Sequence, residues 1–203
     1  MDKIGKLRGF VQEMTRLTAR LGDDEAAILA DGGELLGRLV AADDWLPDRF
    51  AEAHPDYYQQ HLLYCDPLEA FSVVSFVWGP GQGTPVHDHM VWGMIGMLRG
   101  QERCVDFEPS GAGEPLVRGG ESLLEPGDVA KVSPTIGDVH QVSNALSDRP
   151  SISIHVYGGN IGAVNRHIFD AESGRAKPFV SGYVNDVVPN LWDRSAEVRA
   201  ANA

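Results

Sequence analysis

Two closely spaced histidines are the first residues in this chain whose types and spacing suit metal chemistry. His87 and His89 flank Asp88 in the segment Pro85–His89. Residues i and i+2 of a β-strand share one face, so both imidazoles are expected to point the same way, about one metal-ligand span apart. Two partly buried polar side chains on a strand would give the same pattern, so the pair alone leaves both interpretations open.

The residues around this pair favour the metal site. Their spacing resembles the first motif of the cupin barrels at every position but one: Gly81, His87, His89, Gly93 and Gly100. The exception is Gly93, which stands where that motif usually carries a glutamate ligand. Downstream residues resemble the second cupin motif, with one extra residue in each of two spacings: Gly127, Pro134, Gly137, His140 and Asn144. The two motifs together predict a metal bound by His87, His89 and His140.

The predicted ligand set carries no negative charge, because it has three neutral imidazoles and no carboxylate. A divalent ion there keeps its full charge and favours an anionic ligand, for which three protein ligands leave open positions. A thiol fits this site, because coordination removes its proton at neutral pH.

A second group of polar residues lies on the segment Ser151–Tyr157. Strand alternation places Ser153, His155 and Tyr157 on one face and three aliphatic side chains on the other. One interpretation is a half-solvated strand with a few hydrogen bonds. The other is a relay in which Ser153 orients His155 and His155 holds the Tyr157 hydroxyl inside the barrel.

With these motifs, the sequence resembles the thiol dioxygenase family, the iron cupins typified by cysteine dioxygenase, from the N-terminal helices to about Phe169. The resemblance implies that three histidines bind Fe(II), one ion per chain, with O2 as co-substrate. It also implies that the Ser-His-Tyr row places a tyrosine hydroxyl beside the bound O2 and thiol, and that the product is a sulfinic acid.

Two departures indicate which member of the family this is. Animal cysteine dioxygenases carry a cysteine crosslinked to the tyrosine where this chain has Gly93, so Tyr157 is expected to be unmodified. Gln60 stands where cysteine dioxygenase has an arginine that binds the substrate carboxylate. This pattern is similar to the bacterial 3-mercaptopropionate dioxygenases, whose product is 3-sulfinopropionate. A neutral amide binds carboxylate more weakly than a guanidinium, so Arg166 is expected to supply the compensating cation.

Three alternatives stay open at this point. The nearest is a cysteine dioxygenase that produces cysteine sulfinate. A metal-binding cupin without turnover is the alternative from another functional class, although such a module needs no proton-handling row beside its metal. A cupin isomerase that uses Mn or Zn is a third, although such sites commonly keep the carboxylate that Gly93 replaces.

The order of helical and β-rich segments that must position these residues predicts an α+β, mainly β, fold. We expect a cupin (double-stranded β-helix or jelly-roll) barrel with N-terminal helices packed against it. Apolar residues recur at helical spacing from Leu7 to Leu21, where Gly22 ends the helix, and a second helix over about 24–42 is expected to be interrupted at Gly32 and Gly33. Short β-rich segments separated by turn signals such as Gly119–Gly120 follow. We therefore expect one domain, with helices over about 1–50, the barrel over about 58–170 and a covering or loose arm over about 171–203.

Composition limits the partners and the compartment. The 203 residues carry a formal net charge of −12, which repels phosphate backbones and anionic lipid surfaces, so no nucleic-acid or membrane partner is expected. A small thiol carboxylate is the expected partner, in the cytoplasm. Three further side chains are expected to have structural roles. Cys65 and Cys104 are expected to be small, buried apolar groups, and Trp78 is expected to be a packing residue.

Overall fold

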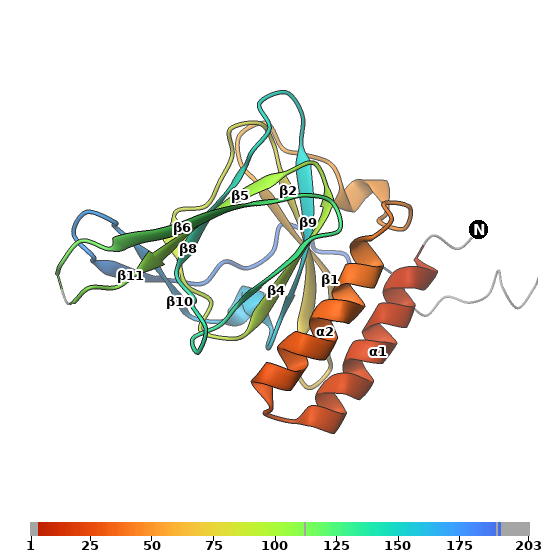
Figure 1. The fold of residues 1–203 in the computed structure, drawn as a ribbon. Coiled ribbons are helices and arrows are strands. Elements are labelled where there is room, and N and C mark those ends of the chain that lie inside the picture. Colours follow the sequence, from red (N-terminus) through yellow and green to blue (C-terminus); the bar gives the residue numbers. More distant parts are fainter. Residues whose placement is uncertain (1–3, 112, 190, 192–203) are drawn as a thin grey trace, which may run out of the picture.

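The computed structural model describes residues 4–111, 113–189 and 191. Its first two helices lie side by side along one side of the β-structure (Figure 1): α1, Gly5–Leu21, and α2, Glu25–Val40. The predicted end of α1 is confirmed, because Gly22 has a φ of 57° and its N–H bonds to the Thr18 carbonyl. The Asp24 side chain caps α2 by accepting a hydrogen bond from the backbone N–H of Ala27.

The expected interruption of α2 at Gly32 and Gly33 is wrong, since the helix continues through both glycines. A Cβ atom at Gly32 would lie 2.9 Å from the Met94 side chain, and one at Gly33 would lie 3.0 Å from the Lys131 side chain. The glycines therefore bring the helix close to the sheet beneath it, and this packing outweighs their low helix propensity.

The strands form two sheets in which every pair of neighbours is antiparallel. One sheet has the order β1-β2-β9-β4-β7 and the other the order β11-β10-β3-β8-β5-β6. This architecture is the predicted cupin double-stranded β-helix. The strands are β1 Gln59–Cys65, β2 Ser72–Trp78, β3 Val86–His87, β4 Gly93–Arg99, β5 Glu102–Glu108, β6 Val117–Leu124, β7 Val129–Val132, β8 His140–Asn144, β9 Ser151–Tyr157, β10 Arg166–Phe169 and β11 Ala176–Phe179, with 3₁₀ turns η1 Asp48–Phe50 and η2 Ile161–Ala163.

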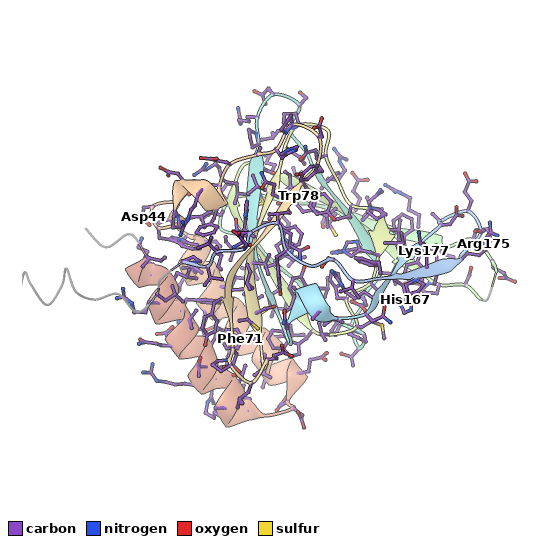
Figure 2. The ribbon with its side chains drawn as sticks, turned by 180° about the vertical axis from the view of Figure 1, so that it is seen from behind. Asp44, Phe71, Trp78, His167, Arg175 and Lys177 are labelled. Atoms are coloured by element: carbon purple, nitrogen blue, oxygen red, sulfur yellow. The ribbon has the colours of Figure 1, made fainter. Side chains whose placement is uncertain are left out.

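One expectation about the later elements is wrong, and the C-terminal arm contributes a strand. Gly119 and Gly120 do not mark a turn but lie inside the edge strand β6, where Gly119 packs close to the Asp106 backbone at a shift in the β5–β6 register. The arm expected after residue 170 contains β11, which pairs with β10 on the side of the molecule away from the helices, where Figure 2 shows His167 and Lys177. Farther along, the Val184 N–H bonds to the Gln60 carbonyl, so the arm covers β1; residues 190 and 192–203 lie outside the described residues.

The core has two main apolar layers that meet at the five-stranded sheet. One face of β2 and β9 packs against the helices through residues such as Val73, Ile154 and Val156, while the other face points into the barrel with Phe76 and Tyr157. Every residue of β9 is buried, so the half-solvated interpretation of this strand is wrong. Among the described residues, no helix combines the length and the apolar character needed to cross a bilayer.

Candidate metal centre and cavity

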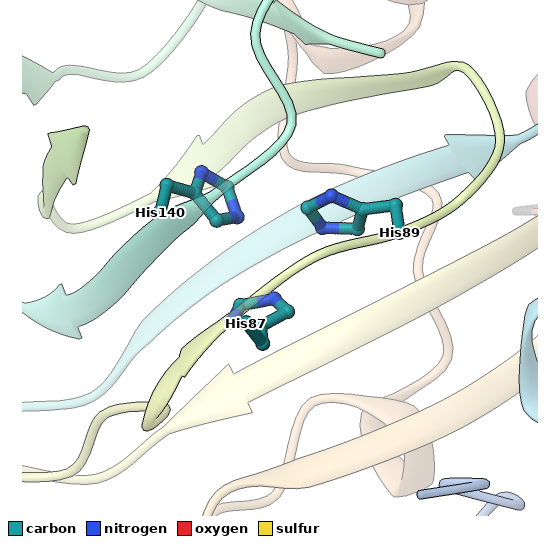
Figure 3. A group of neighbouring side chains, drawn as sticks. All are labelled: His87, His89 and His140. Carbon is teal, nitrogen blue, oxygen red and sulfur yellow. The ribbon is translucent and has the colours of Figure 1, made fainter. Parts of the chain in front are cut away.

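The three histidines predicted as ligands lie together inside the barrel (Figure 3). His87 is on β3 and faces His140, its partner in register at the start of β8. His89 follows β3 and is not on a strand, so its position does not come from the strand alternation that the sequence suggested. The three ring centroids are 4.8 to 4.9 Å apart, and one candidate ligand atom from each ring lies within 4.8 Å of the others.

A different partner engages the Nδ1 atom of each imidazole. His87 Nδ1 is 3.1 Å from the Pro85 carbonyl oxygen, His89 Nδ1 is 2.9 Å from Asp138 Oδ1, and His140 Nδ1 is 3.3 Å from Cys104 Sγ. These contacts leave the Nε2 atoms for a metal. In the described part of the chain, the buried Nε2 of His89 has no hydrogen-bond partner, and a metal ion would satisfy it.

Electrostatics favour the neutral, metal-binding form of two of the three histidines. Burial, together with repulsion from His89, lowers the pKa of His87 to about 3. Burial and the other two imidazoles lower the pKa of His140 well below its ordinary value. Three imidazole nitrogen donors in a buried pocket fit a first-row divalent ion such as Fe(II).

Sequence reasoning missed two residues around the cluster. Asp138 accepts hydrogen bonds from the backbone N–H groups of His89 and Met90, and it orients His89 from a loop 49 residues away. Burial alone would raise the pKa of Asp138, but the bonds from His89 and Met90 lower it. Cys104 is buried as expected, yet it is more than an apolar group, because its Sγ contacts His140 Nδ1. Together with His140 and the exposed Asp106, it forms a second group of possible metal ligands. No motif pointed to either residue, because both contacts depend on tertiary packing.

The three polar residues of β9 form a continuous hydrogen-bonded row. Ser153 Oγ lies 2.8 Å from His155 Nε2, and His155 Nδ1 lies 2.7 Å from the Tyr157 hydroxyl. Burial lowers the pKa of His155 well below its ordinary value and raises that of Tyr157, so both are neutral. The Tyr157 ring stacks on His89 with centroids 5.5 Å apart, which joins the row to the histidine cluster.

The residues at the two ends of this row explain its geometry. Gly93 pairs in register with Tyr157, and a Cβ atom there would lie 2.9 Å from the tyrosine ring. The missing side chain therefore leaves room for the ring. At the other end, the Trp78 indole donates to Ser153 Oγ at 3.3 Å, so Trp78 is not only a packing residue.

A cavity of about 430 Å³, measured with its opening to solvent, connects the cluster, the row and the predicted carboxylate-binding residues. Arg166 is 4% exposed, donates to Ser181 Oγ at 2.7 Å and lies over the Phe179 ring. No carboxylate within 4.0 Å pairs with it among the described residues, and its Nε has no partner there. Gln60 donates to Ser181 Oγ at 3.2 Å and to the Gly182 carbonyl at 3.0 Å. The cavity is lined by Tyr58, Gln60, Phe76, Trp78, Thr84, Pro85, His87, His140, Val142, His155, Tyr157, Arg166, Phe179 and Ser181.

Three further residues with metal-binding side chains lie outside the lining of this cavity. Asp88 points away from the cluster and accepts hydrogen bonds from the backbone and ring of His167. His61 is buried against Phe50 outside the cavity lining. Cys65 is only half-buried, which corrects the expectation of a fully buried side chain.

Similar proteins were found at the level of family, sequence and structure. The family model described as cysteine dioxygenase type I matches residues 38–170. Cysteine dioxygenase type 1 of Danio rerio is 26% identical over 157 residues, which cover 76% of this chain and 71% of that protein. The Homo sapiens protein of the same name is 28% identical over 106 residues, 51% of this chain and 52% of its own, so the match spans about half of the human relative.

Among solved structures, an uncharacterized conserved protein with a double-stranded β-helix domain from Klebsiella pneumoniae is 21% identical. That alignment has a TM-score of 0.45 and covers 57% of this chain and 89% of the other. The family match is more extensive, because it covers more than half of the chain and includes the three histidines, the Ser153–His155–Tyr157 row and Arg166. On this match, the chain belongs to the cysteine dioxygenase type I family.

Proposed function

We propose that this protein is an Fe(II)-dependent thiol dioxygenase with 3-mercaptopropionate as its preferred substrate. Both atoms of O2 are added to the thiol sulfur, which is oxidised to the sulfinic acid of 3-sulfinopropionate. His87, His89 and His140 would bind one Fe(II) per chain. The iron, when bound, supplies the redox chemistry between O2 and the thiol.

The observation that carries the substrate assignment is the buried, unpaired cation in the cavity. Arg166 lines the same cavity as His87 and His140, and no carboxylate compensates its charge among the described residues. A buried charge of this kind favours an anionic ligand. The lining residues include no Asp or Glu, so the carboxylate of a thiol acid gains a partner there whereas the ammonium of cysteine does not.

Gln60 has a supporting role in this proposal. Its amide nitrogen already donates to Ser181 and Gly182, so it orients the segment that also contacts Arg166. Tyr157 contributes at the other side of the cavity, where its neutral hydroxyl reaches the reacting groups and His155 orients it.

Cysteine is the second candidate substrate, because both curated relatives described above are named cysteine dioxygenases. The test loads the chain with Fe(II) without oxygen and then measures O2 uptake and sulfinate for 3-mercaptopropionate, cysteine and cysteamine. We expect the highest kcat/KM for 3-mercaptopropionate. A clear preference for cysteine would refute the substrate assignment and leave the dioxygenase assignment intact.

Substitution of Arg166 tests the carboxylate contact. Losing a charge-assisted bond costs about 1.5–3 kcal/mol, so Arg166→Ala should lower kcat/KM for 3-mercaptopropionate about ten- to a hundred-fold. Gln60→Ala should cost less, about 0.5–1.5 kcal/mol. Arg175→Ala is the matched control, because Arg175 is exposed immediately before β11. An equal loss for cysteamine, which has no carboxylate, would mean that Arg166 serves the fold or the metal instead.

A further inference from the structure

A buried glutamate lies behind the Ser153–His155–Tyr157 row and has no role in the mechanism above. Glu102 is the first residue of β5 and is 0% exposed. Both of its carboxyl oxygens lack a hydrogen-bond partner among the described residues, and no Lys, Arg or His pairs with it there. A leucine would fill such a site at lower cost, so stability alone does not explain an acid at this position.

The polar neighbours of Glu102 are Ser153 of the row and the Trp78 indole that donates to it. Ser153 and Trp78 are the polar side chains that act on its carboxyl group. Burial outweighs both and raises the pKa of Glu102 to about 8, which makes it a neutral acid with one O–H to donate. Glu102 and Ser153 are neighbours but share no hydrogen bond within 3.5 Å in this structure.

We propose that Glu102 is a positioning residue that donates its O–H to Ser153 and thereby sets the direction of every hydrogen bond in the row. The inference deepens the proposed function, because it assigns how the hydroxyl at the reacting end of the row is oriented. Glu102 itself does not line the cavity and does not touch the substrate.

The direction follows from counting donors at Ser153 Oγ. The Trp78 indole can only donate, so it uses one lone pair of this oxygen, and the O–H of Glu102 uses the other. Ser153 must then donate its own proton to His155 Nε2. A neutral His155 consequently carries its proton on Nδ1 and donates it to the Tyr157 oxygen, which leaves the Tyr157 proton free for the cavity.

An apolar residue at position 102 removes this constraint. Ser153 can then accept from His155 Nε2, and His155 Nδ1 accepts the Tyr157 proton in turn. The hydroxyl would then offer the cavity an oxygen lone pair and no proton. The two arrangements contain the same atoms, so only the donor behind Ser153 distinguishes them.

The first test compares Glu102→Leu, Glu102→Gln and the matched control Glu108→Leu, in which an exposed residue of the same strand is changed. Each full-length variant is loaded with Fe(II) and assayed with 3-mercaptopropionate. Glu102→Leu should keep its iron and unfold at the same or a higher temperature, yet lose about ten-fold in kcat with KM within about two-fold. Glu102→Gln, whose amide also donates, should stay within about two-fold of the original kcat. Unchanged kcat in Glu102→Leu, or a loss explained by missing iron, would overturn the proposal.

The second test determines the direction of the hydrogen bonds in the row without measuring enzyme activity. The whole chain carries Zn²⁺ in place of iron, and ¹⁵N spectra of its histidines, assigned with His155→Gln, report which nitrogen of His155 is protonated. We expect Nδ1–H alone in the original chain and in Glu102→Gln, and a detectable population of Nε2–H in Glu102→Leu. The same tautomer in all three would overturn the proposal.

Infrared spectra provide a readout that does not need the leucine variant to fold. The original chain at neutral pH should show the carbonyl band of a protonated carboxyl group, and Glu102→Gln should lack it. Absence of this band in the original chain would overturn the proposal. If the original chain oxidises no thiol, the proposed function fails, while the ¹⁵N and infrared spectra still decide the role of Glu102.

Discussion

Each imidazole of the candidate metal centre is oriented by a chemically different group: a carbonyl, a carboxylate and a thiol. These contacts differ in strength, because a hydrogen bond to the charged Asp138 is stronger than one to a neutral sulfur. Burial and nearby acidic groups raise the pKa of Cys104 to about 12, so its sulfur stays protonated beside His140. His89 is therefore the most firmly oriented of the three ligands, and His140 is the least.

Removal of a histidine should abolish metal binding. His87→Ala, His89→Ala or His140→Ala leaves two ligands, which bind Fe(II) poorly, so we expect loss of iron and activity. Added metal should stabilise the original chain by about 2.7 kcal/mol at a hundred-fold excess over Kd and leave each variant unchanged. Metal analysis and thermal unfolding measure both effects. His54→Ala, outside the ligand group and the cavity lining, is the control. A ligand variant that keeps stoichiometric iron would remove that residue from the ligand set.

The tyrosine at the end of the row should be unmodified and functionally important. Because Gly93 cannot form a thioether, the intact mass should be that of the uncrosslinked chain. Tyr157→Phe should keep iron but lower kcat about ten- to a hundred-fold, since it removes the hydroxyl near the reacting groups. Steady-state kinetics and iron content measure this, with Tyr57→Phe, an exposed tyrosine, as control. Full activity of Tyr157→Phe would mean that the row is structural.

At the level of elements, α2 lies close against β4 and β7 of the five-stranded sheet, next to the strand that carries the row. Gly96 of β4 lies against Leu36 and Val40 of α2, where a Cβ atom would come within 2.8 Å of the Leu36 side chain. The neighbouring strand in the same sheet is β9, which carries the row. Glycine at this contact therefore lets the helix lie close against β4, the strand that pairs with β9 and its Tyr157.

A side chain at this contact should destabilise the fold. Gly96→Val forces the helix and the strand apart and should lower the free energy of unfolding by about 1–3 kcal/mol. Urea unfolding measures the change. Gly9→Ala is the matched control: Gly9 is in α1 with open space around its Cβ position, so alanine there should stabilise by about 0.4–1 kcal/mol. Equal stability of Gly96→Val and the original chain would show that α2 moves freely over the sheet.

For the whole molecule, Glu102 makes the free energy of unfolding decrease as the pH rises, whereas an acid in a salt bridge makes it increase. The folded chain keeps the Glu102 proton up to about pH 8, whereas the unfolded chain loses it near the ordinary pKa of 4.5. Between these values the folded state binds more protons than the unfolded state. The contribution of this proton to the free energy of unfolding is complete below the pKa that Glu102 has in the unfolded chain. It is lost as the pH rises through the pKa that Glu102 has in the folded chain.

Substitution with glutamine should remove this dependence. The free energy of unfolding of Glu102→Gln relative to the original chain should increase with pH, by up to about 1.4 kcal/mol per pH unit between about pH 5 and pH 8. Urea unfolding at several pH values measures the difference. Glu108→Gln, at an exposed position, should give a curve parallel to that of the original chain. A constant difference for Glu102→Gln would show that Glu102 is charged in the folded chain.

The sequence by itself determined the features that depend on local periodicity and spacing. Strand alternation correctly placed Ser153, His155 and Tyr157 on one face of β9, because the period of two is a property of the extended backbone. The helix end at Gly22 and the two-motif cupin barrel were predictable for the same kind of reason.

Only the tertiary structure decided which side chains act on those residues. Asp138 reaches His89 across 49 residues, Cys104 meets His140 through the pairing of β5 with β8, and Glu102 is enclosed behind Ser153. Arg166 is likewise buried without a carboxylate partner among the described residues because it packs against Phe179 and Ser181. Such contacts join residues far apart in the chain, and they follow from strand register and the close packing of the interior, which no local pattern encodes.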